Sequence, residues 1–301
     1  MKKDFLLLRH HSTEELTALL DLAAELKAKT KAGQPHPLLA GKTLAMIFEK
    51  SSTRTRISFE VGMHQLGGKA LYLNSGDLQM GRGESIADTA RVLSRYVDGI
   101  MARVYAQSTV DDLAKWADIP VINGLSDLAH PCQIMADLLT IREHKGSLAG
   151  KTLCYVGDGN NVANSLIWGC IKLGMRVRMA CPTGYDPDET TMAWAYENGD
   201  FACSPDMLAM ASGADVLYTD VWASMGQEEE QAAREAIFAG FQINQAVVNA
   251  AARDCIVMHD LPAKKGQEIS EEVFEAHANV IFDQAENRLH AQKAILVHLM
   301  Q

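Results

Sequence analysis

Short apolar runs alternate with longer helical patterns along almost the whole chain, and this alternation limits the fold more than any other feature. Runs such as Thr43–Phe48 (TLAMIF), Gly99–Arg103 (GIMAR) and Thr152–Val156 (TLCYV) are typical of fully buried strands. Helical patterns lie between them, for example at residues 54–66, 131–144 and 162–173. Strands that alternate with helices in this way form a parallel sheet with helices on its faces.

The same alternation locates the other elements and a domain boundary. We expect further strands at residues 69–73, 120–122, 176–180, 201–203, 215–220 and 256–259, and further helices from residue 12 and at 85–96, 110–117, 189–198, 205–211, 245–252 and 284–300. The pattern breaks at residues 146–150 (GSLAG) and restarts, which places one domain at 1–146 and another at 147–283, before a final helix at 284–301. A length of 301 residues suits two domains. The sequence therefore predicts an α/β fold with two doubly wound parallel-sheet domains, whose ligands bind at the carboxyl ends of the strands.

Charge and cysteine usage exclude several kinds of partner. The chain has 28 Lys and Arg against 38 Asp and Glu, a net charge of -10, which argues against nucleic acid or an anionic membrane as the main partner. The cysteines form no CxxC pair and no zinc-ligand spacing, so we expect no metal and a reducing compartment. No apolar stretch is long enough to span a bilayer, and the N-terminal apolar run is too short for a signal peptide. We therefore expect a cytoplasmic protein.

The segment 51–56 (SSTRTR) is the strongest candidate for a ligand site. It follows an expected strand and opens the next helix. The N-terminus of a helix presents free N–H groups and a partial positive charge, which favour a bound phosphate. Hydroxyl groups and a forked guanidinium in the same turn add further donors. A plain Ser or Thr N-cap is the simpler interpretation for a single residue, but the whole string favours a phosphate site.

Three other side chains stand near the expected ends of strands. Arg103 closes an apolar strand, and because a buried unpaired guanidinium is costly, it is more plausible as a ligand clamp than as a core residue. His130 precedes a helix; a lone histidine is more often structural, but here its imidazole can donate to a developing oxyanion. Asp220 ends another apolar strand and can pair with a substrate ammonium group.

The segment 157–163 (GDGNNVA) has two interpretations. It follows a strand and opens a helix, as a loose dinucleotide-binding fingerprint does. The next strand, however, ends in Ala180 and Cys181 without an acidic residue for a ribose hydroxyl. The amides of Asn160 and Asn161 suit a small amino acid instead, and we prefer this second interpretation.

Several segments together resemble the motifs of the aspartate/ornithine carbamoyltransferase family. Residues 52–56 (STRTR) with 58–60 (SFE) resemble its carbamoyl-phosphate signature, and further matches follow in family order at 101–103 (MAR), 130–133 (HPCQ), 220–226 (DVWASMG), 259–263 (HDLPA) and 286–288 (ENR). HPCQ and the SMG loop are similar to the ornithine branch, whereas the aspartate branch typically has HPTQ and HPLPR. The resemblance covers nearly the whole chain.

The resemblance implies that the first domain binds carbamoyl phosphate. The residues that it assigns to the phosphate are Ser52, Thr53, Arg54 and Thr55, and those that it places around the carbamoyl group are Thr55, Arg103, His130 and Gln133. Arg288 would reach the same site, so that the helix at 284–301 would return to the first domain. Gln79 matches a segment donated across a subunit boundary, which implies a homo-oligomer built from trimers. A flexible surface turn would suit this Gly-rich loop equally well.

The resemblance likewise implies that the second domain binds L-ornithine. Asn161 would contact the α-carboxylate, Asp220 and Ser224 the α-amino group, and Met225 would contribute backbone contacts, while Asp260 and Leu261 stand where the family contacts the δ-amino group. The ornithine branch typically reads HCLP where this chain reads HDLP. An aspartate ionises near ~3.9 and a thiol near ~8.5, so Asp260 is charged more readily. Our hypothesis is that Asp260 orients the amine and helps to accept its proton.

The activity that the resemblance implies is carbamoyl transfer from carbamoyl phosphate to the δ-amine of L-ornithine, giving L-citrulline and phosphate. Arg54, Arg103, His130 and Asp260 would be the catalytic residues, and no cofactor is required. A carbamoyltransferase for another amine, such as putrescine or an N-acylated ornithine, shares every carbamoyl-phosphate residue. An NAD-linked oxidoreductase and a non-catalytic relative are more remote alternatives. The sequence leaves open whether the enzyme serves arginine biosynthesis or arginine breakdown.

Overall fold

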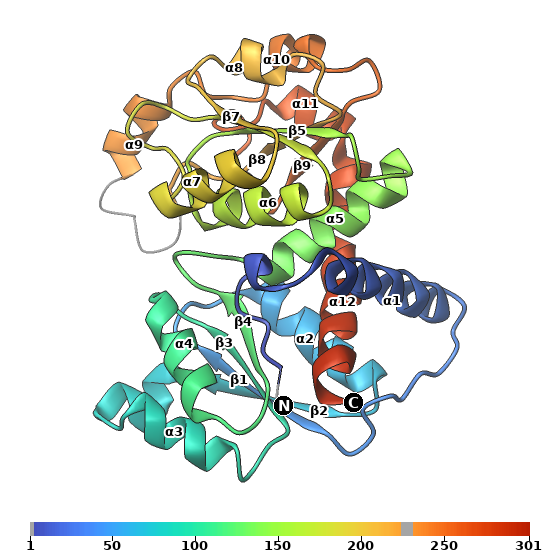
Figure 1. The fold of residues 1–301 in the computed structure, drawn as a ribbon, viewed down its shortest axis with the longest axis vertical. Helices are drawn as coiled ribbons and strands as arrows, with labels where there is room; N and C mark the ends of the chain where they lie inside the picture. The colour runs from blue at the N-terminus through green and yellow to red at the C-terminus, as the bar shows by residue number, and fades with distance from the viewer. Residues whose placement is uncertain (1–2, 224–230) are drawn as a thin grey trace. The chain divides into compact units, whose positions relative to one another are not determined.

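The computed structural model describes residues 3–223 and 231–301, which form two compact units (Figure 1). Unit 1 comprises Met1–Ala136 with Asn287–Gln301, and unit 2 comprises Asp137–Glu286. The division falls inside helices α5 (Pro131–Lys145) and α12 (Ala278–Met300), so each of these helices belongs partly to both units, and the domain bounds expected from the sequence pattern stay a prediction. Gly146 has a φ of 75° directly after α5. It therefore marks the end of a helix, where glycine adopts the left-handed conformation without strain.

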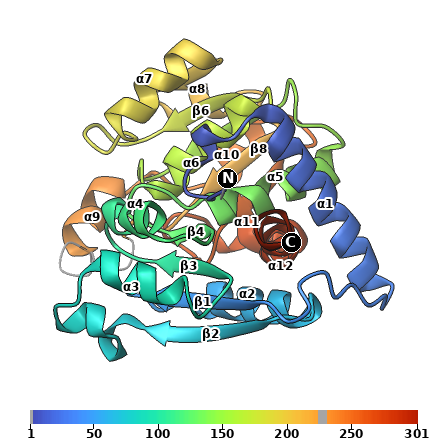
Figure 2. The ribbon, with the colours of Figure 1, turned by 60° about the horizontal axis from the view of Figure 1, so that its bottom comes forward.

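Unit 1 contains a four-stranded parallel sheet in the order β2-β1-β3-β4. Its strands are β1 (Thr43–Phe48), β2 (Lys69–Asn74), β3 (Gly99–Arg103) and β4 (Val121–Leu125), and its helical elements besides the start of α5 and the end of α12 are η1 (Leu8–His10), α1 (Thr13–Lys31), α2 (Thr53–Gln65), η2 (Ser75–Asp77), η3 (Gln79–Arg82), α3 (Ile86–Leu93) and α4 (Gln107–Trp116). α3 and α4 pack on one face of the sheet through Ala90, Val110 and Leu113 (Figure 2). On the other face α2 meets α12 closely, because Gly62 has no side chain and a Cβ there would lie 3.3 Å from Lys293.

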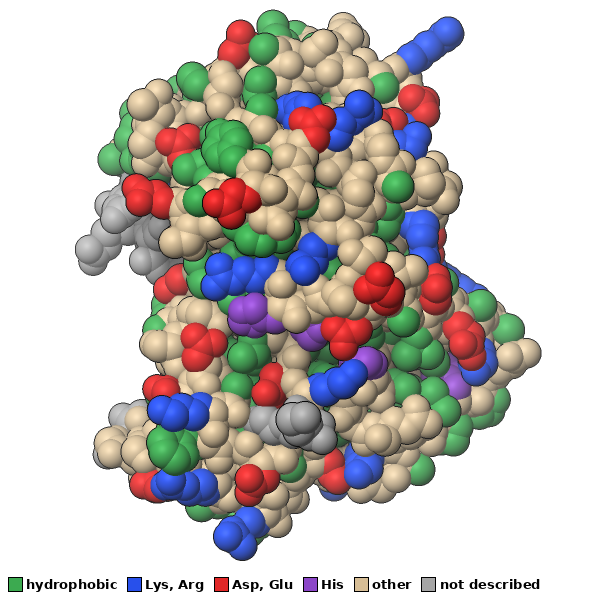
Figure 3. Space-filling view, viewed as in Figure 1, with side chains coloured by type: hydrophobic (Ala, Val, Ile, Leu, Met, Phe, Trp, Pro, Cys, Tyr) green, Lys and Arg blue, Asp and Glu red, His purple; other side chains and the backbone are tan. Residues whose placement is uncertain are grey.

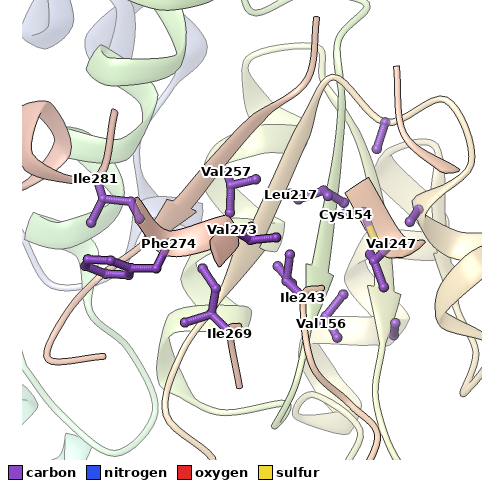
Figure 4. Close-up of a cluster of buried hydrophobic side chains, with 13 residues drawn as sticks. Cys154, Val156, Leu217, Ile243, Val247, Val257, Ile269, Val273, Phe274 and Ile281 are labelled. Carbon is purple, nitrogen blue, oxygen red and sulfur yellow. The ribbon is translucent and has the colours of Figure 1, made fainter. Parts of the chain in front are cut away.

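Unit 2 contains a five-stranded parallel sheet in the order β7-β6-β5-β8-β9. Its strands are β5 (Thr152–Val156), β6 (Arg176–Ala180), β7 (Phe201–Cys203), β8 (Val216–Thr219) and β9 (Ile256–His259), and its helices besides the rest of α5 and α12 are α6 (Asn161–Lys172), α7 (Glu189–Asn198), α8 (Met207–Ala211), α9 (Gln231–Phe238), α10 (Gln245–Ala250) and α11 (Glu271–Ala276). Cys154, Val156 and Leu217 pack on one face against residues of α10 and α11 (Figure 4). Tyr155 and Tyr218 alternate with them and therefore lie on the other face.

These observations confirm the predicted fold class of two parallel-sheet α/β units. Each strand order also has a switch point, where successive connections leave in opposite directions along the sheet. It lies between β1 and β3 in unit 1 and between β5 and β8 in unit 2. Ligands of open α/β sheets bind at the carboxyl ends of the strands beside such points.

Two surface properties complete the description. None of the helices in the described ranges has the length and apolar character that a bilayer crossing requires. On the face drawn in Figure 3, acidic and basic side chains are interspersed rather than gathered into one basic area.

Lys293 on α12 is a fully buried lysine of unit 1. Its Nζ donates to Thr30 Oγ1 (2.6 Å) and Gln65 Oε1 (2.8 Å) and lies 3.2 Å from Nε2 of His36. Nδ1 of His36 lies 2.8 Å from the Gln34 carbonyl, which only accepts, so Nδ1 carries the hydrogen and Nε2 accepts from Lys293. All three partners are neutral, and burial lowers the pKa of Lys293 to about 8.

This lowered pKa predicts that the unit gains stability at alkaline pH. Because the unfolded chain binds the proton more tightly, the free energy of unfolding should rise between about pH 8 and pH 10.5. Below about pH 8 the folded protein carries the full energetic penalty of a charged, buried Lys293. The penalty is on the order of 3 kcal/mol. In denaturant titrations from pH 7 to pH 10, wild type should gain stability relative to Lys293→Met. Lys115→Met, at an exposed position of α4, is the control, and a constant difference for Lys293→Met would refute the prediction.

Candidate active site

The carboxyl end of β1 leads directly into the N-terminus of α2. Ser52 is the N-cap of this helix, and its Oγ accepts the N–H of Thr55 at 3.2 Å. Thr53 and Arg54 form the first turn; Thr53 is exposed and Arg54 is half-buried. A helix start with a polar cap, a second hydroxyl and a guanidinium is suited to a tetrahedral anion.

Two buried arginines converge on the hydroxyl of Thr55. Arg103 ends β3 beside a shift of the β3–β4 register, and its Nη1 lies 3.4 Å from Thr55 Oγ1. Arg288 on α12 donates to Thr55 Oγ1 (3.2 Å) and to Gln133 Oε1 (2.6 Å). Nε of Arg288 donates to Gln292, whose amide in turn donates to Ser58 on α2. Elements far apart in the sequence thus bring the predicted residues Thr55, Arg103, Gln133 and Arg288 together.

His130 lies at the start of α5 and is almost completely buried. Its pKa falls well below the ordinary value, first because of burial and then because of Arg288, Arg103 and Arg54. The imidazole is therefore neutral at physiological pH. A neutral imidazole can donate one hydrogen bond to an oxyanion but cannot serve as a strong acid.

Gln79 occupies a different position from these residues. It begins η3 (Gln79–Arg82) and its side chain is exposed. Among the described residues, the structure gives no hydrogen bond between its side chain and the cluster around Thr55. The predicted role of Gln79 therefore stays a prediction about an assembly.

In unit 2, the loop after β5 and the loop after β8 are joined by a hydrogen bond. Asn160 caps α6, with its Oδ1 accepting the N–H groups of Val162 and Ala163. Its Nδ2 donates to Asp220 Oδ2 at 2.7 Å, and the other oxygen of Asp220 accepts the N–H of Val221. Asn161, the first residue of α6, is half-buried. Buried Asp220 is thus held by two donors at the switch point.

A second carboxylate lies beside Asp220. Ligand atoms of Asp220, His259 and Asp260 all lie within 4.8 Å of one another. Nδ1 of His259 accepts the N–H of Leu261 (2.9 Å), so Nε2 carries the hydrogen and donates to Glu268 (2.9 Å). Because both ring nitrogens are engaged, the group offers two carboxylates rather than three metal ligands. Two adjacent carboxylates are suited to an ammonium group.

The conformation of the loop that carries Asp260 and Leu261 is fixed by buried groups. Leu261 has a φ of 61° and precedes Pro262 through a cis peptide bond. Glu268 also accepts the N–H of Lys264, and Gln284 accepts the N–H of His259. Sequence reasoning missed Glu268 and Gln284, because nothing in their spacing signals a contact with residue 259.

Arg234 on α9 is a second group that sequence reasoning missed. Its guanidinium pairs with Asp158 in the loop after β5, and its Nε donates to the carbonyl of Trp222 at 2.7 Å. Both ionic groups are buried. Arg234 thereby connects the two loops of unit 2 that carry Asn161 and Asp220. The predicted residues Ser224 and Met225 lie outside the described residues.

Comparison with protein families assigns both parts of the chain. Residues 3–143 match the carbamoyl-P binding domain of aspartate/ornithine carbamoyltransferase, and residues 149–299 match its Asp/Orn binding domain. The chain belongs to the aspartate/ornithine carbamoyltransferase family.

Ornithine carbamoyltransferases are among the proteins that resemble the chain along its whole length. The chain is 58% identical to an ornithine carbamoyltransferase of Syntrophotalea carbinolica, with 100% of both chains covered. The solved structure of the Pyrococcus furiosus ornithine carbamoyltransferase has a TM-score of 0.96 at 55% identity, covering 99% of this chain and 97% of that one. An acetylornithine transcarbamylase complexed with acetylcitrulline is more distant, with a TM-score of 0.88 at 33% identity and 99% of each chain covered.

Membership of this carbamoyltransferase family also decides between the two interpretations of the segment 157–163. The family is defined by carbamoyl transfer and not by nucleotide binding. In the structure the Asn160 amide is engaged within the protein, because its Oδ1 caps α6 and its Nδ2 donates to Asp220. The NAD-linked alternative is therefore set aside.

Proposed function

We propose that the protein transfers the carbamoyl group of carbamoyl phosphate to the δ-amine of L-ornithine, giving L-citrulline and phosphate. The observation that carries this proposal is the contrast between the two switch points. The one in unit 1 gathers guanidinium groups around Thr55, and the one in unit 2 gathers carboxylates around Asp220. The first suits an anionic acyl phosphate, and the second suits an amino acid with two ammonium groups. The names of the full-length relatives support the same substrates.

In this proposal, unit 1 binds carbamoyl phosphate and activates it. Ser52, Thr53, Arg54 and the N–H groups of α2 hold the phosphate. Arg103 and neutral His130 donate to the carbamoyl oxygen as negative charge develops on it. Gln133 and Arg288, which bond each other, complete the surroundings of the carbamoyl group.

Unit 2 binds ornithine in this proposal. Asn161 contacts the α-carboxylate, Asp220 with Ser224 and Met225 contacts the α-amino side, and Asp260 with Leu261 contacts the δ-amine. The δ-amine must attack as the free base, although a free alkylammonium group has a pKa near ~10.4. The leaving phosphate and Asp260 are the candidate proton acceptors.

A panel of amines tests the proposal directly. Purified protein is given carbamoyl phosphate with ornithine, N-acetylornithine, putrescine, lysine or aspartate, and both phosphate and carbamoylated product are measured. We expect citrulline from ornithine at the highest kcat/KM. Preferential turnover of N-acetylornithine or putrescine would contradict the assignment of ornithine and keep that of carbamoyl phosphate.

Asp260 variants test the residue at which this chain departs from its family. Asp260→Asn should lower kcat/KM for ornithine by about 10- to 100-fold, because an ionic hydrogen bond is lost. It should also shift the acid limb of the pH profile to lower pH by about one unit, since a nearby carboxylate raises the pKa of the bound amine. The measurements are kcat/KM and, at saturating ornithine, kcat from pH 6 to pH 10, with exposed Asp200→Asn as the control. The acid limb is read from kcat, because kcat reports the pKa of the bound amine. An unchanged kcat/KM would show that Asp260 has no part in ornithine turnover.

We also propose that the protein is a cytoplasmic homo-oligomer built from trimers and serves arginine biosynthesis. Exposed apolar side chains at Ile57, Val61 and Leu71 lie on α2 and the edge strand β2 and support self-association. All six cysteines are free thiols, as suits a reducing compartment. A Pyrococcus furiosus relative 55% identical over 99% of this chain is named anabolic. Light scattering should give three times the chain mass of 32.9 kDa or a multiple of that, and a monomer would contradict the oligomer.

A further inference from the structure

The hydroxyl of Tyr155 is a buried polar group that the proposed roles above do not use. Tyr155 lies on β5 and is completely buried. Among the described residues, its hydroxyl has no hydrogen-bond partner. A buried hydroxyl without a partner costs free energy, so its presence calls for a physical explanation.

The neighbouring Tyr218 is a buried tyrosine whose hydroxyl does have hydrogen-bond partners, and it therefore serves as a comparison. Tyr218 pairs with Tyr155 across β5 and β8, and the two rings are stacked with centroids 6.0 Å apart. Its hydroxyl donates to Asp137 at 2.9 Å and accepts from Gln284 at 3.0 Å. Two tyrosines in matching positions therefore differ in whether the protein itself binds the hydroxyl.

The Tyr155 hydroxyl lies near Gly157, the residue that follows the carboxyl end of β5. A Cβ placed on Gly157 would lie 3.6 Å from the Tyr155 hydroxyl and 3.7 Å from Thr219 Oγ1, both ordinary contacts. Gly157 has a φ of 142°, which disfavours any side chain there. The hydroxyls of Tyr155 and Thr219 therefore both lie near Gly157, and Thr219 is the residue directly before Asp220.

The electrostatic surroundings of the hydroxyl are acidic. Burial raises the pKa of Tyr155, and the charges of Asp220, Asp158 and Asp260 raise it further. The phenol consequently keeps its proton at physiological pH. It can donate that proton and still accept a hydrogen bond.

We propose that Tyr155 is a specificity-determining positioning residue of the amino-acid site, whose hydroxyl binds one water beside Gly157 that links it to Asp220 and to the substrate ammonium group held there. This proposal rests on the proposed function. A buried water needs two to four polar partners. The hydroxyls of Tyr155 and Thr219, the carboxylate of Asp220 and an N–H of the ammonium group provide them. The water would bind well only when an ammonium group completes this set, so that Tyr155 favours substrates with a free α-amino group.

Tyr155→Phe tests the proposal, with Tyr218→Phe as the matched control. Tyr155→Phe should raise KM for ornithine about 10-fold, leave KM for carbamoyl phosphate unchanged and keep the melting temperature, because the deleted hydroxyl has no protein partner. Tyr218→Phe should lower the melting temperature and leave both KM values unchanged. Unchanged KM for ornithine in Tyr155→Phe, or an equal rise in Tyr218→Phe, would overturn the proposal.

Two further measurements separate this proposal from the proposed function and from a folding defect. If wild type turns over an amine other than ornithine, the proposed function fails, and the KM of that amine then tests Tyr155 in the same two variants. In wild-type protein labelled with ζ-13C tyrosine, one buried tyrosine resonance should move when ornithine is added in the presence of phosphate and stay in place with phosphate alone. Absence of any such shift would count against Tyr155 even if its variant did not fold.

Discussion

Replacing Arg103 by methionine should lower kcat by about 100- to 1,000-fold, which is the usual cost of removing one donor from a developing oxyanion. Arg103 is buried at the end of β3 and its guanidinium lies next to Thr55. Methionine keeps the length and apolar stem of the side chain and removes only its charge and donors. Thr55 retains Arg288 as a partner, so the local structure should persist.

The control for Arg103→Met is Arg91→Met in the same unit. Arg91 is exposed on α3, where it pairs with Asp88 and lies over the ring of Trp116. Its loss should leave kcat unchanged. Steady-state rates with both substrates at saturation measure the effect, and the hypothesis fails if the two arginine variants have equal kcat.

The neutral state of His130 gives this prediction a further consequence. Because its pKa lies well below the ordinary value, acidification toward pH 6 should not activate the enzyme by charging the imidazole. The three arginines that lower this pKa are also those that surround the proposed carbamoyl phosphate. His130 therefore acts as a hydrogen-bond donor to the oxyanion and not as a proton-donating acid. The sequence alone left open whether its imidazole is neutral or charged.

Local patterns were enough to predict most of the fold. Strands β1, β3, β5, β6, β7 and β9 have the bounds that the apolar runs indicate. In β3, β5 and β9 every residue is buried, which produces an uninterrupted apolar run. α1 also begins next to residue 12 as expected, and Ser12 and Glu15 form a capping box there. α11 was missed because its six residues carry too little periodicity. α12 begins at Ala278 rather than near residue 284. Residues 278–283 contain no Pro or Gly that would stop the helix from extending to this earlier start.

The candidate site was predictable only where chemistry is encoded in consecutive residues. The segment 51–56 predicts an anion site because the N-cap residue, the hydroxyl groups and a guanidinium group lie in one helical turn. Glu268, Arg234 and Tyr155 could not be found in this way, because their roles depend on which strand or loop lies beside them. A buried glutamate or tyrosine has the same local pattern whether or not it faces a ligand.

Replacing Asp220 by asparagine should raise KM for ornithine at least about 100-fold while leaving carbamoyl-phosphate binding unchanged. Two effects combine. The residue that binds the substrate ammonium group loses its negative charge. The NH2 group of the new asparagine must also face either Asn160 or the N–H of Val221, both of which donate to Asp220. Asn160 cannot turn its amide to compensate, because its Oδ1 caps α6. A charged hydrogen bond together with an unsatisfied buried donor accounts for an effect of this size.

Kinetics with each substrate varied separately, with Asp200→Asn as the control for a charge lost elsewhere on unit 2, measure the Asp220 effect. The comparison with Arg103→Met is the decisive one. If unit 1 activates carbamoyl phosphate and unit 2 binds the amine, Arg103→Met must act mainly on kcat and Asp220→Asn mainly on KM for ornithine. If both variants raised the same KM, the two clusters would not have separate substrates, and the division of labour between the two sheets would be wrong.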